Sequence, residues 1–217
     1  MPALAANLTV NNTLALTSGD LSTGANTLTL GSGATVTSAG GGDVVGNVQR
    51  NGAFSTATDY RFSNANTLIN FASVTNGASP SVTVNLSKSA PSGLTTAVAR
   101  VYTITPADIS SYDATLRLGY QDSEVIGMTE ANMRAWKYNG SRWVLQTGGV
   151  DTTNNYVYAT NVAGFSEWAI TDNGGPTAIT LSSFNARADA PDALPLIGLG
   201  ALMGIGLGAG AWWTRRK

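Results

Sequence analysis

The strongest constraint on this chain is an apolar segment near its C-terminal end. From Leu194 to Trp213 no side chain carries a charge or an amide. A helix over these twenty residues, at about 1.5 Å per residue, is about 30 Å long and matches the hydrocarbon core of a bilayer. The segment ends with two interfacial tryptophans and a basic cluster, Trp212, Trp213, Arg215, Arg216 and Lys217. These features predict a single transmembrane helix within residues 194–217, with its basic end in the cytoplasm and the preceding chain outside.

The glycines of this segment favour a membrane over a soluble protein core. Six glycines lie within residues 198–210, and each would cost about 1 kcal/mol relative to alanine in a water-soluble helix. Gly200, Gly204 and Gly208 recur every four residues, a spacing that lets two helices approach closely in lipid. Two interpretations of this spacing stay open, namely helix packing and the general richness of sorting signals in small residues.

The absence of two residue types limits the catalytic and metal-binding chemistry that the chain can perform. The 217 residues include no cysteine and no histidine, which removes disulfides, thiolate nucleophiles, histidine-based triads and the usual zinc ligand sets. Chains without disulfides are compatible with export to a bacterial surface. Ahead of Leu194 there are nine basic residues (12 minus the three at the end) and thirteen acidic ones, a net charge of −4. Nucleic acid is therefore not an expected partner, and no cofactor is expected.

The first 39 residues carry a short internal repeat. Residues 12–19 (NTLALTSG) return as residues 26–33 (NTLTLGSG), an offset of fourteen. Short apolar-polar-apolar alternations surround them, so residues 7–39 are predicted to form rungs of a parallel β-solenoid. The alternative is a β-hairpin meander. Residues 1–6 contain the small-x-small pattern of a signal-peptidase site, and we interpret them as a signal-peptide remnant or as part of a longer protein.

Residues 38–42 form a glycine-rich break, after which the alternating runs become longer. Residues 43–172 are expected to form an antiparallel β-sandwich of immunoglobulin-like type, with about nine strands. The predicted strands are 44–50, 67–73, 81–87, 96–105, 114–120, 132–138, 142–146, 156–162 and 165–171. The predicted fold class is thus all-β, with a solenoid-like segment, a sandwich, a linker over 173–193 and one transmembrane helix.

Two turns that contain asparagine predict hairpins. Asn139-Gly140 suits a two-residue type I′ turn, which would place Trp136 opposite Trp143. The predicted core face then holds Trp136, Tyr138 and Trp143, and the predicted solvated face holds Ala135, Lys137, Arg142 and Val144, with Lys137 opposite Arg142. A second hairpin is expected at Asn154-Asn155.

Four segments of the predicted sandwich form a recognisable set. They are RVYTITP (100–106), ATLRLGY (114–120), EANMRAWKYNG (130–140) and GFSEWAI (164–170). They resemble a β-sandwich module near the C-termini of large secreted bacterial surface proteins, where it commonly follows β-helix repeats. Residues 179–186 (ITLSSFNA) are similar to the connector that follows this module. The resemblance covers about residues 7–186 and implies adhesin-like or structural surface display, with no catalytic residue.

The C-terminal end has the three parts of a bacterial sorting signal. Pro191-Asp192 precedes the glycine-rich apolar segment, and Arg215-Arg216-Lys217 follows it. This arrangement is similar to the PEP-CTERM type, although that family has Pro-Glu-Pro where this chain has Pro-Asp-Ala. The resemblance implies processing by an exosortase-like transpeptidase. Residues 194–198 (LPLIG) are similar to the sortase pattern LPxTG but place Ile197 at the reacting position, so a sortase is the weaker expectation.

Few residues suggest catalysis or metal binding. Asp122 and Glu124 would share a strand face like the paired carboxylates of a glycosidase, or lie in a solvated turn, which we favour. The candidate calcium ligands are Asp20, Asp43, Asp151 and Asp172, which lack the spacing of a calcium-binding loop. A glycan-binding platform is the alternative role for Trp136, Tyr138 and Trp143.

These observations predict a non-enzymatic, adhesin-like or structural protein on a bacterial cell surface, anchored or sorted by its C-terminal helix. The expected partners are the membrane, a sorting transpeptidase, and surface polysaccharide or other surface proteins. The alternative function is a carbohydrate-binding module held at the surface, and a glycosidase is the third interpretation.

Overall fold

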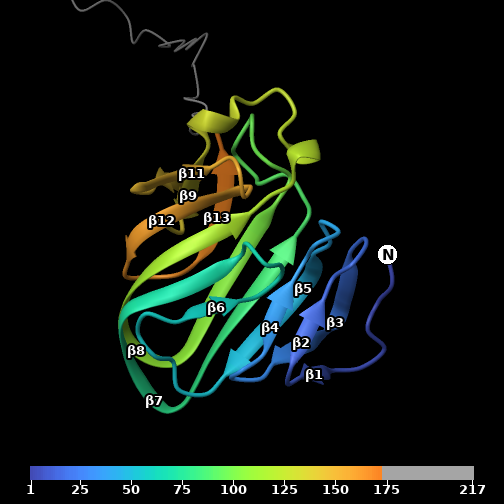
Figure 1. The fold of residues 1–217 in the computed structure, drawn as a ribbon. Helices are drawn as coiled ribbons and strands as arrows, with labels where there is room; N and C mark the ends of the chain where they lie inside the picture. The colour runs from blue at the N-terminus through green and yellow to red at the C-terminus, as the bar shows by residue number, and fades with distance from the viewer. Residues whose placement is uncertain (173–217) are drawn as a thin grey trace, which may run out of the picture. The chain divides into compact units, whose positions relative to one another are not determined.

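The computed structural model describes residues 1–172, and the predicted linker (173–193) and transmembrane segment (194–217) lie outside the described residues. In the described part the chain is all-β, as predicted, with thirteen strands and two single-turn 3₁₀ helices, η1 (Asp122–Glu124) and η2 (Glu130–Asn132). None of the helices in residues 1–172 is long and apolar enough to cross a membrane. Figure 1 shows the first five strands gathered at one side and two long strands, β7 and β8, crossing the molecule.

The N-terminal strands pair in parallel. β1 (Leu8–Val10) pairs with β3 (Leu21–Leu30), and β3 pairs with β5 (Val44–Asn51). β2 (Thr13–Ala15) and β4 (Thr35–Thr37) form a separate two-stranded parallel sheet. Inward aliphatic side chains such as those of Leu28, Leu30 and Val36 are buried between these strands. Parallel pairing of successive short strands is the arrangement that stacked solenoid rungs make.

The repeat of fourteen residues is not the length of a rung. Leu8 lies opposite Leu28 and Thr13 lies opposite Thr35, so paired positions are 20 (28 − 8) and 22 (35 − 13) residues apart. The two copies of the repeat lie on β2 and on the end of β3, which belong to different sheets. They are similar because both are short strands with alternating apolar residues, and not because one stacks on the other.

Residues 1–6 are part of this parallel region. Leu4 N donates to Ser22 O (2.9 Å), and Ser22 N donates to Pro2 O (2.8 Å). Leu4 packs against the core. The hypothesis of a signal-peptide remnant does not anticipate this contact.

Beyond β5 the strand pairs are antiparallel, as predicted for residues 43–172, but they continue the same sheet as the parallel strands, so the main sheet is mixed. β5 pairs with β7 (Leu68–Ser87), and β7 pairs along its length with β8 (Val101–Gly119). Residues 7–39 and 43–172, which the sequence predicts as separate modules, therefore share one sheet. The described residues fall within one compact unit.

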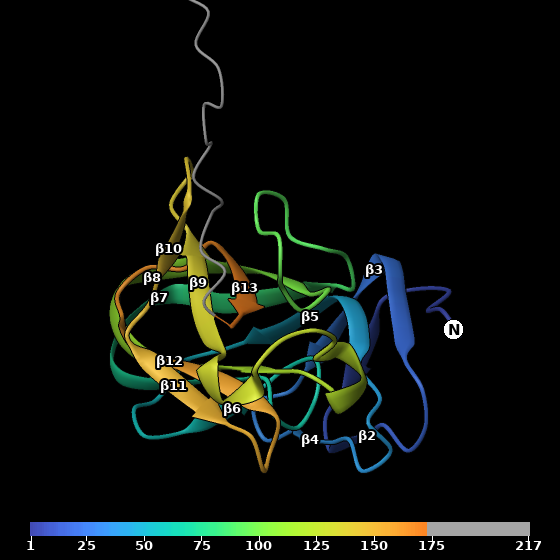
Figure 2. The ribbon, with the colours of Figure 1, turned by 90° about the horizontal axis from the view of Figure 1, so that it is seen from above.

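The remaining strands extend the sheet from β8. β13 (Glu167–Thr171) lies between β8 and β9 (Arg134–Tyr138), and β10 (Trp143–Leu145) pairs with β9 (Figure 2). β12 (Tyr156–Val162) pairs with β8 and with β11 (Gly148–Asp151), and β6 (Asp59–Arg61) pairs with β7. The last described strand is thus an interior strand of the sheet.

Two pairs of predicted strands are each joined into one long strand. β7 contains residues 68–73 and 81–87 of two predicted strands, and β8 contains residues 101–105 and 114–119 of two others. The sequence between each pair, 74–80 in β7 and 106–113 in β8, continues the antiparallel pairing across register shifts. These connecting residues have little apolar alternation because most of them are not buried, which explains why the sequence pattern marks them as turns.

The Asn139-Gly140 hairpin forms with a longer turn than predicted. Trp143 lies opposite Tyr138, so Trp136 lies opposite Leu145 and not opposite Trp143. Asn139 Oδ1 accepts hydrogen bonds from the backbone N of residues 141 and 142 (3.0 and 2.9 Å), which stabilises a four-residue turn. The pairing is shifted by two residues, an even number, and Trp136, Tyr138 and Trp143 therefore still share a face.

The opposite face of this hairpin is solvated only in part, because Arg142 is exposed but Ala135 is buried. Ala135 is 1% exposed and packs in the main core, and Lys137 Nζ lies 6.0 Å from the centroid of the buried Trp168 ring. Lys137 lies opposite Val144 and not, as predicted, opposite Arg142, so these two like charges do not face each other. Ala135 and Trp136, on opposite faces of β9, each pack in a buried hydrophobic cluster, so both faces of β9 are covered there.

The second predicted hairpin is confirmed. β11 and β12 pair antiparallel with Asp151 opposite Tyr156, and residues 152–155 form the turn. Asp151 Oδ1 accepts from Thr153 N (3.1 Å) and Asn154 N (3.0 Å), and Asn155 has φ of 55°. Asparagine tolerates this left-handed conformation better than most residues.

Candidate functional site

A pair of opposite charges is buried where the parallel strands meet the antiparallel ones. Asp43 directly precedes β5 and is 1% exposed, and Arg100 directly precedes β8 and is fully buried. Arg100 Nη2 lies 2.6 Å from Asp43 Oδ2, and Arg100 Nη1 lies 3.1 Å from Asp43 Oδ1. The guanidinium therefore binds both carboxylate oxygens, a geometry that fixes the two groups relative to each other. The pair joins the start of β5 to the start of β8.

Three further charged side chains extend this pair into a network. Arg100 Nε donates to Glu124 Oε2 in η1 (2.7 Å). Lys88, which follows β7, places Nζ 2.7 Å from Asp43 Oδ2 and 2.8 Å from Asp20 Oδ2. Three carboxylates and two cations give the network a formal charge of −1 (2 − 3).

The network keeps its members charged. Burial by itself raises the pKa of Asp43, but hydrogen bonds and charge from Arg100, with Lys88 and Asn64, outweigh burial and hold the pKa below its ordinary value. Burial lowers the pKa of Lys88, yet its bonds to Asp20 and Asp43 raise the pKa above the ordinary value. These two groups are therefore poor candidates for a general acid or base near neutral pH.

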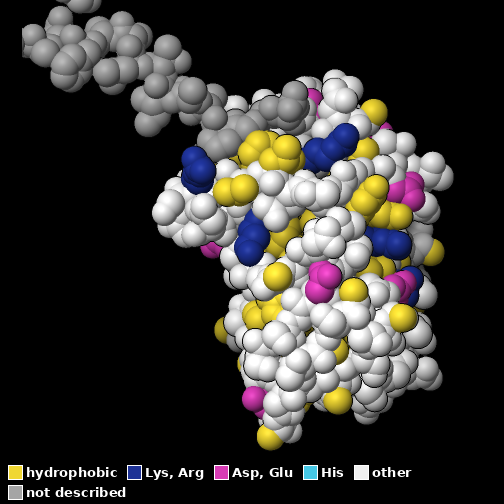
Figure 3. Space-filling view, turned by 90° about the vertical axis from the view of Figure 1, so that its left-hand side faces the viewer, with side chains coloured by type: hydrophobic (Ala, Val, Ile, Leu, Met, Phe, Trp, Pro, Cys, Tyr) yellow, Lys and Arg dark blue, Asp and Glu magenta, His cyan; other side chains and the backbone are white. Residues whose placement is uncertain are grey.

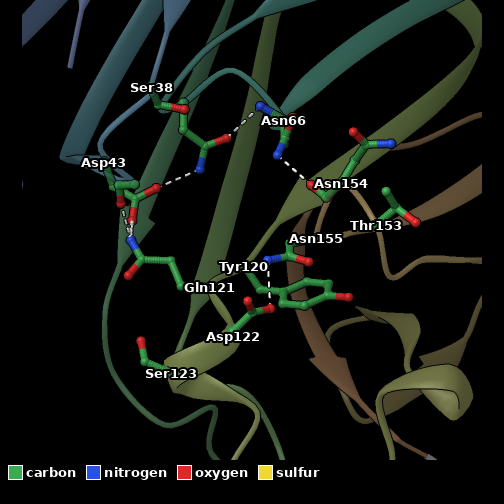
Figure 4. A pocket seen from close by; sticks show the side chains of 13 residues that line it. Ser38, Asp43, Asn66, Tyr120, Gln121, Asp122, Ser123, Thr153, Asn154 and Asn155 are labelled. Atoms are coloured by element: carbon green, nitrogen blue, oxygen red, sulfur yellow. Dashed lines mark hydrogen bonds between the residues drawn. The ribbon is translucent and has the colours of Figure 1, made fainter. Parts of the chain in front are cut away.

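A polar cleft opens beside this network (Figure 4). Its volume is about 500 Å³, which is typical of small-molecule sites. Its walls are residues 38–43 ahead of β5, the turn at 64–66, residues 120–123 around η1, and the β11–β12 turn at 153–155. Uncharged polar side chains dominate the lining, namely Ser38, Asn64, Asn66, Gln121, Ser123, Thr153, Asn154 and Asn155.

Hydrogen bonds within the protein hold the amide side chains of the cleft. Asn66 Nδ2 donates to Asn154 O (2.5 Å), and Asn155 Nδ2 donates to Asp122 Oδ1 (2.7 Å). Deeper in the cleft, Asn64 Nδ2 and Gln121 Nε2 donate to Asp43 (2.5 and 3.2 Å). Through Asp43, the charged network therefore forms the floor of the cleft, and the amide side chains are held in position in the absence of a ligand.

The structure does not pair the carboxylates of Asp122 and Glu124. Both lie in η1 and not on an extended strand. Asp122 is exposed, as expected for a turn residue. The same expectation is wrong for Glu124, whose side chain is only 17% exposed because it accepts hydrogen bonds from Arg100 Nε and from the backbone N of Gln121.

The candidate calcium ligands do not converge on one site. Asp20 and Asp43 come together, but the ammonium group of Lys88 lies between them. Asp151 stabilises the β11–β12 turn, and Asp172 accepts from Thr129 N (2.7 Å). Within residues 1–172 no group of three His, Cys, Asp or Glu side chains is arranged to hold a metal ion.

The predicted glycan-binding aromatics lie away from the cleft. Trp136 and Trp143 are 9% and 6% exposed and pack in a small cluster with Leu94 and Ala169. Trp143 Nε1 donates to the backbone O of residue 92 (2.7 Å), so the loop between β7 and β8 covers it. Tyr138 is half-buried and lines a separate groove of about 860 Å³. Neither indole offers a ring face to solvent.

The predicted sorting, anchor and helix-packing residues lie outside the described residues. They are Pro191, Asp192, Arg215, Arg216, Lys217, Gly200, Gly204 and Gly208. Their roles stay predictions.

Sequence reasoning missed the two cations of the network. One signal could have found Arg100. Val98, Arg100, Tyr102 and Ile104 alternate along one strand direction, and all four are buried. A charged residue at an inward position of an apolar alternation requires a buried partner. Lys88 carries no such signal, because its partner Asp20 is 68 residues away in the chain.

Comparison with family models, with curated protein sequences and with solved structures finds no match to this chain. The class of protein that the fold and the cleft define is thus an all-β protein with a mixed sheet and a polar surface cleft.

Proposed function

We propose that this chain is a non-enzymatic, adhesin-like protein displayed on a bacterial cell surface and anchored or sorted by residues 194–217. The observation that supports a binding role is that the carboxylates around the cleft are held by hydrogen bonds and ion pairs within the protein. Asp43 and Glu124 are bound by Arg100, and Asp122 is bound by Asn155. A carboxylate held in a buried ion pair is poorly placed to exchange a proton with a substrate, whereas a binding site needs polar groups in fixed positions. The cleft supplies fixed groups.

The fold supports the finer architecture that we propose. In it, residues 7–39 form the last rungs of a solenoid-like stack, and residues 43–172 form an immunoglobulin-like sandwich. The support comes from the parallel pairing of β1, β3 and β5, followed by antiparallel strands. The face seen in Figure 3 carries few charged side chains, of both signs, scattered among hydrophobic and other uncharged surface. Such a surface suits an extracellular protein better than a nucleic-acid-binding one.

The proposed anchor rests on the sequence. Leu194–Trp213 is apolar over a length that spans a bilayer, and Arg215-Arg216-Lys217 follows it. Pro191-Asp192 ahead of this segment supports cleavage by an exosortase-like transpeptidase, with a sortase as the weaker candidate.

Cell fractionation tests this proposal. The full chain, exported from a bacterial host behind a signal peptide, is expected in the membrane fraction and accessible to protease added to intact cells. A chain that ends at residue 193 is expected to be released. Equal release of both chains, or protection of both from the protease, would contradict surface anchoring. Mass spectrometry of the mature C-terminus then distinguishes a permanent span, which keeps residues 215–217, from a processed signal.

A further inference from the structure

We infer that the polar cleft between η1 and the β11–β12 turn binds a neutral saccharide. This inference rests on the binding role proposed above and names the class of ligand. It places the saccharide at a different site from the Trp136 and Trp143 cluster, which is buried.

The charge of the cleft decides against anionic ligands and against calcium. Of the described residues that line it, none is a lysine or an arginine, so an anion finds no counter-charge. Arg100 is near but fully buried, and its guanidinium is bound by Asp43 and Glu124. Asp43 is neutralised by Arg100 and Lys88, which leaves Asp122 as the one exposed carboxylate among the described lining residues. One carboxylate is too few for a calcium site.

The polar atoms that face the cleft suit hydroxyl groups. Asn66 and Asn155 each donate their amide NH₂ to the protein, and no hydrogen bond among the described residues uses Asn66 Oδ1, Asn155 Oδ1 or Asp122 Oδ2. These oxygens accept hydrogen bonds. The Ser123 hydroxyl likewise has no partner in the described part of the chain and can donate. A ligand that both donates and accepts at several adjacent positions matches this pattern, as the hydroxyl groups of a sugar do.

The cleft requires little ordering when a ligand binds. Asn66 bridges to the β11–β12 turn across 88 residues of sequence, and Asn155 holds η1 from the same turn. Side chains that are already fixed lose little conformational entropy on binding, so a few hydrogen bonds give useful affinity. The cleft is open to solvent through the exposed residues Ser123, Thr153 and Asn154.

Glycan-array binding of the full chain, kept in a detergent without a sugar headgroup, tests this inference. Binding to one or more neutral glycans is expected, and the best of these is then titrated by calorimetry. Asp122→Asn replaces an acceptor with a donor, and Ser123→Ala removes a donor. Each is expected to weaken binding about tenfold, the effect of one lost hydrogen bond. Asp113→Asn, the same change in β8 away from the cleft, is the matched control and is expected to leave the affinity unchanged.

Each other outcome overturns the inference. Absence of binding to every neutral glycan, or binding to acidic glycans alone, excludes the ligand class. Binding that Asp122→Asn and Ser123→Ala leave unchanged, in variants with the melting temperature of the wild type, places the site elsewhere. These measurements use purified protein, so they are independent of whether the chain is anchored at the cell surface.

Discussion

Asp43 and Arg100 hold opposite charges in a part of the molecule that water barely reaches. Removing water from such ions costs several kcal/mol each, and their attraction and hydrogen bonds offset that cost only when the geometry is good. Here both carboxylate oxygens are bound by the guanidinium. The net contribution of the pair is modest, but each member depends on the other.

Breaking this pair is therefore expected to be costly. Arg100→Met leaves the Asp43 carboxylate buried with Lys88 as its one remaining cation, and we expect a loss of about 3–5 kcal/mol in the free energy of unfolding. Urea denaturation followed by circular dichroism measures it. Arg142→Met is the control, because Arg142 is exposed and has no ion-pair partner among the described residues. A loss for Arg100→Met no larger than that of the control would show that the pair is dispensable.

The pKa of Asp43 predicts acid sensitivity. Because its folded pKa lies below the unfolded value, Asp43 contributes stability that is present above the unfolded pKa of about 3.9 and is lost as the pH falls through the folded pKa. The melting temperature should therefore fall as the pH drops below about 4. Asp43→Asn is expected to melt lower at neutral pH and to show a shallower fall in acid. Parallel pH curves for the two proteins would mean that other carboxylates cause the acid sensitivity.

Single residues also show where sequence reasoning reaches its limit. The inward position of Arg100 follows from the alternation of Val98, Tyr102 and Ile104, so its burial could be predicted. Its partners could not, because Asp43 lies 57 residues away and directly follows a glycine-rich break. The cleft was missed for the same reason. Asparagine is common in ordinary turns, so the asparagines of the cleft give no separate signal in the sequence, and only the fold brings them together.

At the scale of elements, strand alternation predicts which residues of a hairpin share a face, whereas the residues of the turn do not predict its register. Alternation places Trp136, Tyr138 and Trp143 on one face whether the turn has two residues or four, so that prediction is confirmed despite the wrong register. The turn length depends on how the Asn139 side chain is used, and its Oδ1 binds two backbone N–H groups. The identity of the residues in a turn does not fix this choice.

The junction between β3 and β5 depends on one glycine. Gly46 has φ of 106°, and a Cβ there would overlap the hydroxyl of the buried Thr23, which accepts a hydrogen bond from Asn47 N (2.9 Å). The β3–β5 register shifts at this point. Gly46→Ala is expected to lower the free energy of unfolding by about 2 kcal/mol or more, from backbone strain and overlap.

Gly33→Ala is the matched control for this junction. Gly33 has no positive φ, and nothing lies within 4 Å of the position of its Cβ. Its stability should stay within about 0.5 kcal/mol of the wild type. Equal unfolding midpoints in urea for Gly46→Ala and Gly33→Ala would show that the backbone at residue 46 is not constrained.

At the scale of the whole molecule, the all-β class and most strands were predictable, and the joining of the strands was not. Each short alternating run corresponds to a strand or to part of one. Contacts between distant segments join the short runs into the long strands β7 and β8. Such contacts also pair β5 in parallel with β3 and antiparallel with β7. Local patterns carry little information about such contacts.

The position of β13 makes the fold depend on its last described strand. β13 lies between β8 and β9, and its Trp168, Ala169 and Ile170 are fully buried. A chain that ends at residue 163 leaves β8 and β9 without this shared neighbour, so we expect it to be largely unfolded. A chain that ends at residue 178 keeps the compact unit and is the control. Circular dichroism and the dispersion of amide proton signals distinguish the two. Native-like spectra for the shorter chain would show that β13 is dispensable.

Because β13 is both interior to the sheet and late in the chain, it determines when the sheet can be completed during synthesis. A ribosome makes the chain from the N-terminal end, so β1 to β5 emerge first and β13 emerges after all the strands that it joins. At usual rates, synthesis of these residues takes on the order of 10 s. Until synthesis reaches β13, β8 and β9 lack the strand that lies between them. The newly made chain thus cannot complete its sheet during the interval in which a protein bound for the cell surface, as we propose, has to be threaded through a membrane.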